Sequence, residues 1–391
     1  MAACGCASEL DMRLLVLSCT ALVLLTACAP PRQVSDSGFG AYAVSLATFD
    51  DGLALAWYDT RHGNAEIYVR PLDAAGGDAG SELRLTTTEA QSFEADIAPL
   101  GGAFAVAWYE KAPDGALRAQ LGVWSRDGAH RWTTPLAIGM QSSRIPVVRS
   151  FGGALFCAWV EAAADGSETV WAGWWEADGR RRGPPVALGR ACATTWNLNA
   201  AIADSGGALV VFDAQAGTDV EELFLATLAD GRVTLTQLST DDGVRSKYPD
   251  VALAGTDAAL TWFDERDGNR EIYLAVAPLR ALSPVEPHAR RITNTAGESI
   301  GAYVAWNRQR IGLAWSDEID GNFEVYFQSF DAGNYPQAEP QRLTETPTNS
   351  MIPAIKPWRD GFAVAWDEVT PGAAGMHDET TRAEVLFMTV R

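Results

Sequence analysis

One short segment recurs along the chain and limits what the chain can fold into. It reads LTWFDERDGNREIYLA from Leu260 to Ala275, with near copies from Leu55 (LAWYDTRHGNAEIYVR) and from Leu313 (LAWSDEIDGNFEVYFQ). In each copy an apolar run ends in an aromatic residue, and an acid, a Gly-Asn turn and a second apolar run follow. Two such runs joined by residues that tolerate positive φ predict a β-hairpin.

The aromatic residue of this hairpin recurs at nearly even spacing. Alignment of the copies gives seven anchors, 50 to 53 residues apart, at Trp57, Trp108, Trp159, Phe212, Trp262, Trp315 and Trp366. A repeat of this length is typical of solenoids, propellers or arrays. The anchors therefore predict seven structural repeats, with each anchor aromatic in the core.

Each repeat contains four short strand-like runs. In the fifth they are Tyr248–Leu253, Ala258–Phe263, Glu271–Ala277 and Arg290–Thr293, separated by turn residues. No sustained period of 3.6 is present, so helices should be scarce. The second run of each repeat is apolar on both faces, which favours a strand covered from both sides. We predict an all-β fold, a seven-bladed β-propeller with four-stranded blades.

The two ends of the chain complement one another. The last repeat ends at Arg391 after its third strand, while RQVSDS at Arg32–Ser37 aligns with the fourth-strand segments RRITNT, QRLTET and LRLTTT of other repeats. We therefore predict that the N-terminal strand completes the last blade and removes an open sheet edge. The predicted propeller spans residues 32–391, with blades at 39–91, 92–142, 143–195, 196–245, 246–298, 299–349 and 350–391 plus 32–38.

The first residues read as a targeting segment. Arg13 precedes an apolar run from Leu14 to Ala27, too short for a membrane span and typical of a signal peptide. LTAC, ending at Cys28, resembles the lipobox of bacterial lipoproteins. This resemblance implies a signal peptide at residues 1–27, lipidation of Cys28, a tether at residues 28–31, and a lipid anchor to the bacterial envelope, at the outer membrane. A plain secretory signal is the alternative, and Met12 is an alternative start.

Charge and cysteine content exclude some classes of function. The formal net charge is −20 at pH 7, which repels phosphate backbones, so we expect no nucleic-acid partner. Six cysteines would become three after processing, at Cys28, Cys157 and Cys192. A bridge between Cys157 and Cys192 stays open, but we favour two unpaired thiols because Cys157 lies in an apolar run. No Cys/His spacing indicates zinc.

The words W-x-D-x-R-x-G-N-x-E-I-Y, from Trp57 to Tyr68, and R-x-L/I-T resemble the propeller repeats of TolB and its periplasmic relatives. The resemblance is strongest in repeats one, five and six. It implies a propeller fold and an envelope location, although TolB has six blades and an extra domain where we count seven repeats and no extra domain. Similar repeats occur in bacterial surface proteins described as sialidase-like, but the sialidase Asp-box S-x-D-x-G-x-T-W is not present.

The hairpin turns carry the first group of candidate binding residues, which are Asp59, Arg61, Asp264, Arg266 and Asp317. A structural interpretation has each Arg bridging the acids before and after the turn, such as Asp59 and Glu66. A functional interpretation has a ring of polar loops that binds a polymer or a protein. The segment from Asp317 to Glu324 could hold calcium through clustered oxygens, although it lacks the alternating Asp ladder, and no other cofactor or metal is expected.

Surplus tryptophans form the second group of candidates, which are Trp174, Trp175 and Trp196. Adjacent residues of a strand point to opposite faces, so Trp174 or Trp175 could be exposed and stack on a sugar or anchor a protein. Packing in the core is the competing interpretation. The four histidines fall in different repeats, and no catalytic motif is present, so we assign no catalytic residue.

Together these features favour a membrane-anchored envelope β-propeller, a monomeric ring that serves as a protein-binding or glycan-binding scaffold module. Its partner would be an envelope protein or a glycan. The alternative is a sialidase-like or other glycoside hydrolase with a carboxylate site at the central channel. A cluster of Arg, Tyr and Glu at the channel mouth would favour the hydrolase, and a channel of small residues would favour the binding module.

Overall fold

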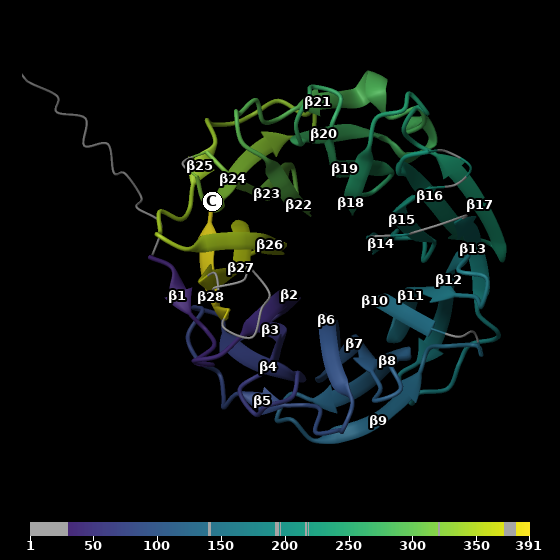
Figure 1. Ribbon diagram of the computed structural model, residues 1–391, viewed down its shortest axis with the longest axis vertical. Coiled ribbons are helices and arrows are strands. Elements are labelled where there is room, and N and C mark those ends of the chain that lie inside the picture. Colours follow the sequence, from purple (N-terminus) through teal and green to yellow (C-terminus); the bar gives the residue numbers. More distant parts are fainter. Residues whose placement is uncertain are drawn as a thin grey trace, which may run out of the picture.

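The computed structural model describes residues 30–139, 142–191, 195, 197–215, 217, 219–319, 321–370 and 381–391. These residues form seven four-stranded antiparallel sheets, arranged as blades around a central axis (Figure 1). The predicted seven-bladed all-β fold is therefore confirmed. Within these ranges helix is limited to the 3-10 segments η1 (Leu279–Ala281) and η2 (Glu286–His288), and none is long enough to cross a membrane.

Every blade runs from an inner strand at the axis to an outer strand at the rim. Blades 1 to 4 contain β2 (Ala41–Phe49), β3 (Gly52–Asp59), β4 (Glu66–Asp73), β5 (Leu83–Arg84); β6 (Gln91–Leu100), β7 (Ala103–Lys111), β8 (Leu117–Ser125), β9 (His130–Pro135); β10 (Ser142–Phe151), β11 (Ala154–Ala162), β12 (Glu168–Glu176), β13 (Val186–Ala191); β14 (Leu198–Ile202), β15 (Ala208–Ala214), β16 (Glu222–Ala229), β17 (Arg232–Gln237). Blades 5 to 7 contain β18 (Ser246–Ala254), β19 (Asp257–Asp264), β20 (Glu271–Pro278), β21 (Ala289–Arg291); β22 (Ser299–Asn307), β23 (Arg310–Asp317), β24 (Glu324–Asp331), β25 (Gln341–Arg342); β26 (Asn349–Trp358), β27 (Gly361–Thr370), β28 (Arg382–Val390) and β1 (Arg32–Gln33).

The core lies between neighbouring blades rather than inside one layer. One cluster joins blades 4 and 5 through Leu209 and Trp262, and another joins blades 1 and 2 through Val69 and Trp108. The seven anchor aromatics are each at most 2% exposed, as predicted. Second strands such as β19 are buried along almost their whole length because a neighbouring blade covers each face, which explains their lack of a polar face.

The ring is closed by the start of the chain. Strand β1 pairs antiparallel with β28, Arg32 opposite Phe387 and Gln33 opposite Leu386. Beyond β1, the Val34 N–H donates to the Val385 carbonyl over 2.7 Å. The predicted completion of the last blade is confirmed, because β1 lies beside β28 as the outermost strand of that blade (Figure 1).

Six of the seven inner strands carry a bulge near their start, which sets the shape of the channel. The register shifts in all except β14, and residues at positive φ mark the bulges, at Ala43, Glu94, Ile145, Tyr248, Gly301 and Ile352. A bulge inserts one extra residue and redirects the strand. The preceding blade stabilises three of them, because Asp213, Ser316 and Asp367 accept backbone N–H groups at the bulge of the next blade.

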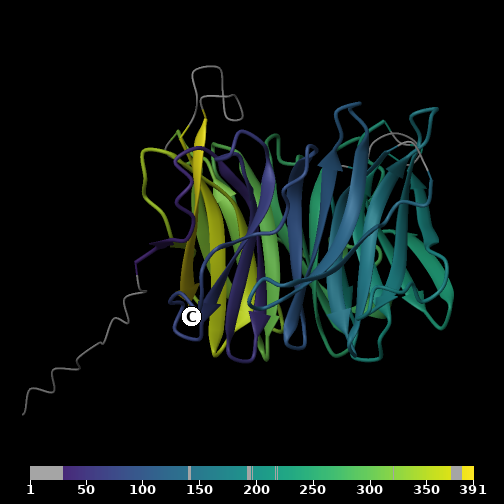
Figure 2. The ribbon, with the colours of Figure 1, turned by 90° about the horizontal axis from the view of Figure 1, so that it is seen from below.

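The ring has two faces (Figure 2). The hairpins between second and third strands, such as residues 60–65 and 265–270, lie on the side where the inner strands begin, and we call this side the hairpin face. The turns between first and second strands, such as 50–51 and 255–256, lie on the other side, called the turn face. Because all blades repeat this arrangement, a residue's place in its blade predicts its face.

Candidate functional site

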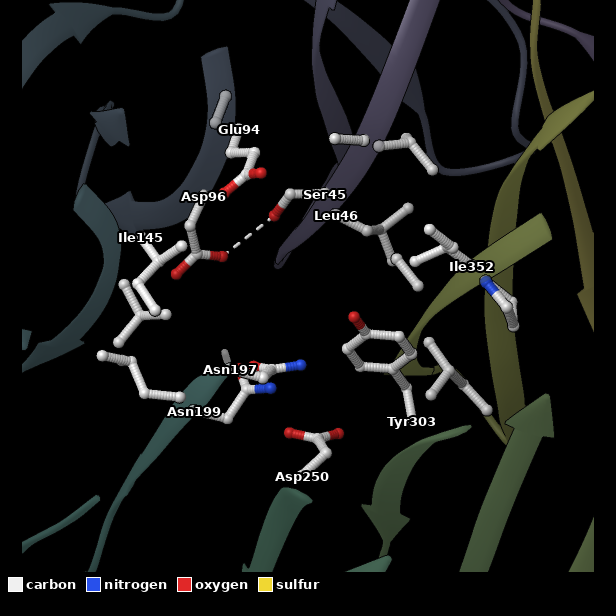
Figure 3. A pocket seen from close by; sticks show the side chains of 18 of the residues that line it. Ser45, Leu46, Glu94, Asp96, Ile145, Asn197, Asn199, Asp250, Tyr303 and Ile352 are labelled. Carbon is white, nitrogen blue, oxygen red and sulfur yellow. Dashed lines mark hydrogen bonds between the residues drawn. The ribbon is translucent and has the colours of Figure 1, made fainter. Parts of the chain in front are cut away.

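The inner strands of all seven blades line a cavity of about 310 Å³ on the axis (Figure 3). Ala43 and Ile352 at the bulges lie nearest the hairpin face, and Arg149 and Lys356 lie deepest. Apolar side chains such as Leu46 and Val147 alternate with polar ones. A concave cavity of this size with a few convergent polar groups is a typical small-ligand site.

Asp96 and Arg149 are the centre of a hydrogen-bond network in the channel. Asp96 accepts hydrogen bonds from the Ser45 hydroxyl at 3.0 Å and the Val148 N–H at 2.7 Å, and it pairs with Arg149 at 2.6 Å. Arg149 also donates to the Ala200 carbonyl and to Asn199. These contacts connect four consecutive blades, so Asp96 and Arg149 stabilise the ring and are already committed to protein partners.

A second group of polar side chains faces the same cavity with capacity to spare. The Tyr303 ring reaches toward the axis, opposite Asn197 and Asn199 (Figure 3). Asp250 accepts the Val304 N–H at 2.9 Å, and burial raises the pKa of its carboxyl group. Burial also raises the pKa of Tyr303, so its hydroxyl stays protonated and can donate to a ligand.

Glu94 marks the mouth of the channel. It stands at the positive-φ bulge of β6, exposed to the channel and enclosed by protein elsewhere. Burial raises the pKa of Glu94, while the charge of Arg144 and a hydrogen bond from Tyr109 oppose that shift. A carboxyl group, a phenol and a guanidinium therefore converge at one side of the mouth.

Lys356 differs from the other cation of the channel. The residues at the same place in the other inner strands are Arg149 and five alanines, Ala47, Ala98, Ala201, Ala252 and Ala305. Lys356 lines the cavity and makes no hydrogen bond or ion pair with any described residue. Burial lowers its pKa, and the charge of Arg149 acts in the same direction, while Asp250 and Asp96 oppose them. A buried amine without a partner is a natural contact for an anion, because the negative charge would stabilise the protonated form that burial disfavours.

The hairpin candidates form structural networks on the hairpin face. Arg61 binds Asp59 through its side chain and its backbone N–H, and it reaches Glu82 at 2.7 Å. The expected bridge from Arg61 to Glu66 is wrong, because Arg84 of the fourth strand takes Glu66 at 3.2 Å and Thr86 also donates to it. The fourth strand therefore supplies the partner that the hairpin alone could not identify.

The later repeats show the same arrangement. Arg266 pairs with Asp264 at 2.5 Å, while Arg291 and Thr293 hold the buried Glu271. Asp317 accepts hydrogen bonds from Ser299 at 3.1 Å and from the Trp315 indole at 3.3 Å. The hairpins place Asp59, Asp264 and Asp317 in separate blades, each inside its own network, so the structure does not bring these candidates together.

The tryptophan candidates divide between core and surface. Trp175 is fully buried and packs 6.0 Å from Trp159, whereas Trp174 is half-buried and packs 5.2 Å from Phe156. Trp196 lies outside the described residues, as do Cys28 and Cys192. Cys157 is a free thiol, buried in the core of blade 3. Among the described residues, no three His, Cys, Asp or Glu side chains form a group that could hold a metal ion.

The channel residues were missed by sequence reasoning, although a signal existed. In bulged blades the second channel position lies twelve residues before the anchor, and it reads Ser45, Asp96, Val147, Asp250, Tyr303 and Ala354. This column varies while the anchors stay aromatic. Comparing this position between the repeats would therefore have pointed to the residues that line the channel.

No family model matches the sequence, and no curated protein matches it at a significant level. Solved structures do share the fold. The polysaccharide lyase Uly1 superposes with a TM-score of 0.56 at 9% identity, over 95% of this chain and 94% of the lyase. The phage phi92 endosialidase gives 0.55 at 11% identity, over 92% of this chain and 68% of its own.

The β-propeller domain of the Trilobed protease from Pyrococcus furiosus gives a TM-score of 0.53 at 10% identity, over 90% of this chain and 94% of that domain. Its description reports an open velcro topology, whereas here β1 pairs with β28 and closes the ring. At such identities the likeness shows the fold alone. The chain thus belongs, by architecture, to the seven-bladed β-propellers.

Proposed function

We propose that the protein is a glycan-binding propeller of the bacterial cell envelope, and that its channel takes an acidic saccharide. The observation that carries this proposal is Lys356, an enclosed cation that faces the cavity with no protein partner. A carboxylate or sulfate on the ligand would supply the missing counter-charge. Tyr303, Asn197 and Asn199 would donate to or accept from hydroxyl groups of the sugar.

The similar structures are consistent with this ligand class. Two of them are named as a polysaccharide lyase and an endosialidase, names that describe enzymes acting on glycans. For the present chain we infer that the channel binds a glycan rather than cleaving it. The carboxylate of Asp96 pairs with Arg149 and is therefore not available as a catalytic acid or base. Lys356 and the Tyr303 hydroxyl group suit binding, and the narrow cavity suits a chain end or a branch of a glycan.

The proposal includes a lipid anchor on Cys28. The place where the N-terminal segment joins the propeller would then determine which face of the ring lies toward the membrane. Arg32 contacts Asp78 in the β4–β5 connection, on the side of the turn face, and the chain then runs toward the hairpin face, where Ser37 donates to Asp59. Four residues of tether span at most about 14 Å. The turn face would therefore lie near the membrane, with the channel mouth directed away from it.

A binding experiment tests the ligand class. The soluble chain from Pro30 onward is applied to an array of acidic and neutral glycans, alongside Lys356→Met and a matched control, Lys111→Met, at an exposed residue that does not line the cavity. We expect wild type and the control to bind acidic glycans, and Lys356→Met to lose at least tenfold in affinity while keeping its circular dichroism spectrum. Equal binding by Lys356→Met, or no glycan binding by wild type, would refute the proposal.

Labelling tests the anchor separately. Expression in bacteria with an alkyne-palmitate analogue should label the full chain, and Cys28→Ala should abolish both the label and membrane retention. Unlabelled protein released as a soluble secreted chain would instead support the plain secretory signal.

A glycoside hydrolase is the second candidate, and the cluster of Glu94, Tyr109 and Arg144 at the mouth favours it. A carboxyl group whose pKa burial raises can act as a general acid. Hydrolysis of sialosides or aryl glycosides by wild type, lost in Glu94→Gln, would establish this activity. Binding without turnover on the same substrates would support the binding module.

A further inference from the structure

A second cavity, of about 450 Å³, lies between blades 3 and 4 near the turn face and apart from the channel. Its walls are the end of β12, the connection to β13, and two turns of blade 4, residues 203–207 and 229–232. None of its lining residues belongs to the channel. We call this cavity the lateral groove.

Trp174 forms the aromatic wall of the lateral groove. The neighbouring Trp175 points into the core and is fully buried, so strand alternation turns Trp174 toward the groove. Trp174 packs on Phe156 and keeps part of its surface exposed. Its indole N–H makes no hydrogen bond to any described residue. A half-exposed indole supported from behind is a rigid platform for a sugar ring.

The opposite wall carries polar groups that no protein group occupies. Asp230 stands at positive φ in the tight turn between β16 and β17, and Arg232 follows it. Both side chains are exposed and lack a hydrogen bond or an ion pair within the described part of the chain. Arg182, by contrast, is held by Glu176 at 2.9 and 3.1 Å. One free carboxylate and one free guanidinium offer both acceptors and donors at no net charge.

Glycines keep the groove open. Gly206, Gly207 and Gly231 all line it, and a Cβ on Gly231 would meet no atom within 4 Å. A side chain at Gly231 would project into open space and narrow the groove, whereas a Cβ on Gly206 would press against the Phe151 ring at 3.0 Å. The exposed Val186 and Val233 add apolar surface at its edge.

We propose that the lateral groove binds a neutral saccharide, with Trp174 stacking on a sugar face and Asp230 and Arg232 hydrogen-bonding to its hydroxyl groups. The balanced charges of Asp230 and Arg232 favour a neutral ligand, because the pair leaves no net charge for an ionic group of the ligand to neutralise. The site is separate from the acidic-glycan site of the channel. Occupancy of both would let one molecule hold two glycan chains or two parts of one polymer.

Neutral and acidic oligosaccharides distinguish the two sites. Saturation-transfer NMR and titration with cello-, chito- and malto-oligosaccharides are run on wild type, Trp174→Ala, the double variant Asp230→Ala/Arg232→Ala, and Lys356→Met. Trp132→Ala is the matched control, a half-buried tryptophan outside the groove whose indole N–H donates to the Ala177 carbonyl. Loss of the platform should weaken neutral binding about tenfold.

We expect a neutral oligosaccharide to bind wild type, Trp132→Ala and Lys356→Met alike, and to bind both groove variants at least tenfold more weakly. The double variant changes two exposed side chains, Asp230 in the turn and Arg232 at the start of β17, and an unchanged circular dichroism spectrum would separate its loss of binding from unfolding. The lateral groove proposal would be overturned if no neutral oligosaccharide bound the wild-type protein. It would also be overturned if the double variant bound with unchanged affinity. Loss of neutral binding in Lys356→Met would also overturn it, since that would place the sugar in the channel.

Discussion

Blades 1, 5 and 6 use their polar residues differently from blades 2, 3 and 4. In blade 5 the hairpin Asp264, Arg266 and Glu271 are all paired with groups of the same blade. Blades 2 to 4 lack this complete network, whereas both groups of blades supply polar residues to the channel, such as Glu94 and Asn199 from the divergent blades and Asp250 and Tyr303 from the consensus blades. The repeated signature therefore serves stability within its own blade, and it does not decide which blades supply the polar groups of the channel.

The rims of the two groups of blades differ as well. The outer strands β5, β21 and β25 have two or three residues, whereas β9, β13 and β17 have six each. In blade 5 the Arg-Ile-Thr element, Arg291 to Thr293, holds the short outer strand, because the Ile272 N–H donates to the Thr293 hydroxyl and Arg291 pairs with Glu271. Where this element is lost, a longer ladder of backbone hydrogen bonds replaces it, and the lateral groove opens beside β17.

The anchor aromatics should contribute equally to stability in the consensus blades and in the divergent blades. Trp262 in blade 5 and Phe212 in blade 4 are both buried between blades. Replacing either with alanine should lower the free energy of unfolding by about 3–5 kcal/mol, through lost apolar burial and a cavity. Urea unfolding followed by tryptophan fluorescence and circular dichroism measures this. A tolerated Phe212→Ala would mean that the divergent blades are held by something other than the repeated core.

The glutamate at the start of the third strand should contribute differently to stability in blade 5, a consensus blade, and in blade 4, a divergent blade. Glu271 accepts from Arg291 and Thr293, whereas Glu222 of blade 4 accepts from Ser239 and leaves Oε1 buried without a partner. Burial raises the pKa of Glu222 to about 7. At pH 8, Glu271→Gln should cost about 2 kcal/mol because Arg291 loses its charged partner, and Glu222→Gln should cost nothing or stabilise.

Chemical unfolding of both glutamine variants at pH 8 and pH 5 checks this pair. The Glu222→Gln advantage should vanish at pH 5, where wild-type Glu222 is already protonated. Equal losses in the two variants would show that the networks do not differ in strength.

The seam between blades 7 and 1 should respond to pH. Asp367 accepts the backbone N–H groups of Ala43 at 2.6 Å and Val44 at 3.2 Å, and burial raises its pKa to about 7. The folded protein therefore binds this proton more tightly than the unfolded chain, so Asp367 lowers stability as pH rises from about 4 to 7. Asp367→Asn should flatten that slope in unfolding curves recorded across this range. If stability still fell with rising pH in Asp367→Asn, the pH dependence would come from other groups, such as Glu222.

The smallest effect is expected at a consensus hairpin. Arg266→Ala removes the pair with Asp264, and because Arg266 is about a quarter exposed the loss should be near 1 kcal/mol. Acidic-glycan affinity, measured on the same array as for Lys356→Met, should not change, because the hairpin lies outside the channel. A clear loss of binding would revive the hairpin ring as the binding surface.

The architecture could be predicted from the sequence because it rests on local patterns that repeat. The pattern can be recognised from Trp57 and its equivalents, from the Gly-Asn turns, and from the likeness of Arg32–Ser37 to the fourth strands of other blades. Because the pattern recurs seven times, an ambiguous strand in one repeat can be assigned from the others. The site could not be predicted this way. Asp96, Asn199 and Lys356 lie far apart in the chain, and no pattern within a single repeat shows that their side chains share one cavity.

The sequence by itself determined the strand pattern, the number of blades and the way the ring closes, because periodic burial and turn chemistry are properties of each segment alone. Only the tertiary structure decided which side chains share the channel, that Arg84 rather than Arg61 holds Glu66, and that Trp174 faces a groove while Trp175 is buried. The reason is geometric. Closing the ring brings seven inner strands onto one axis, and only then does it matter which charge has a partner and which, as at Lys356, has none.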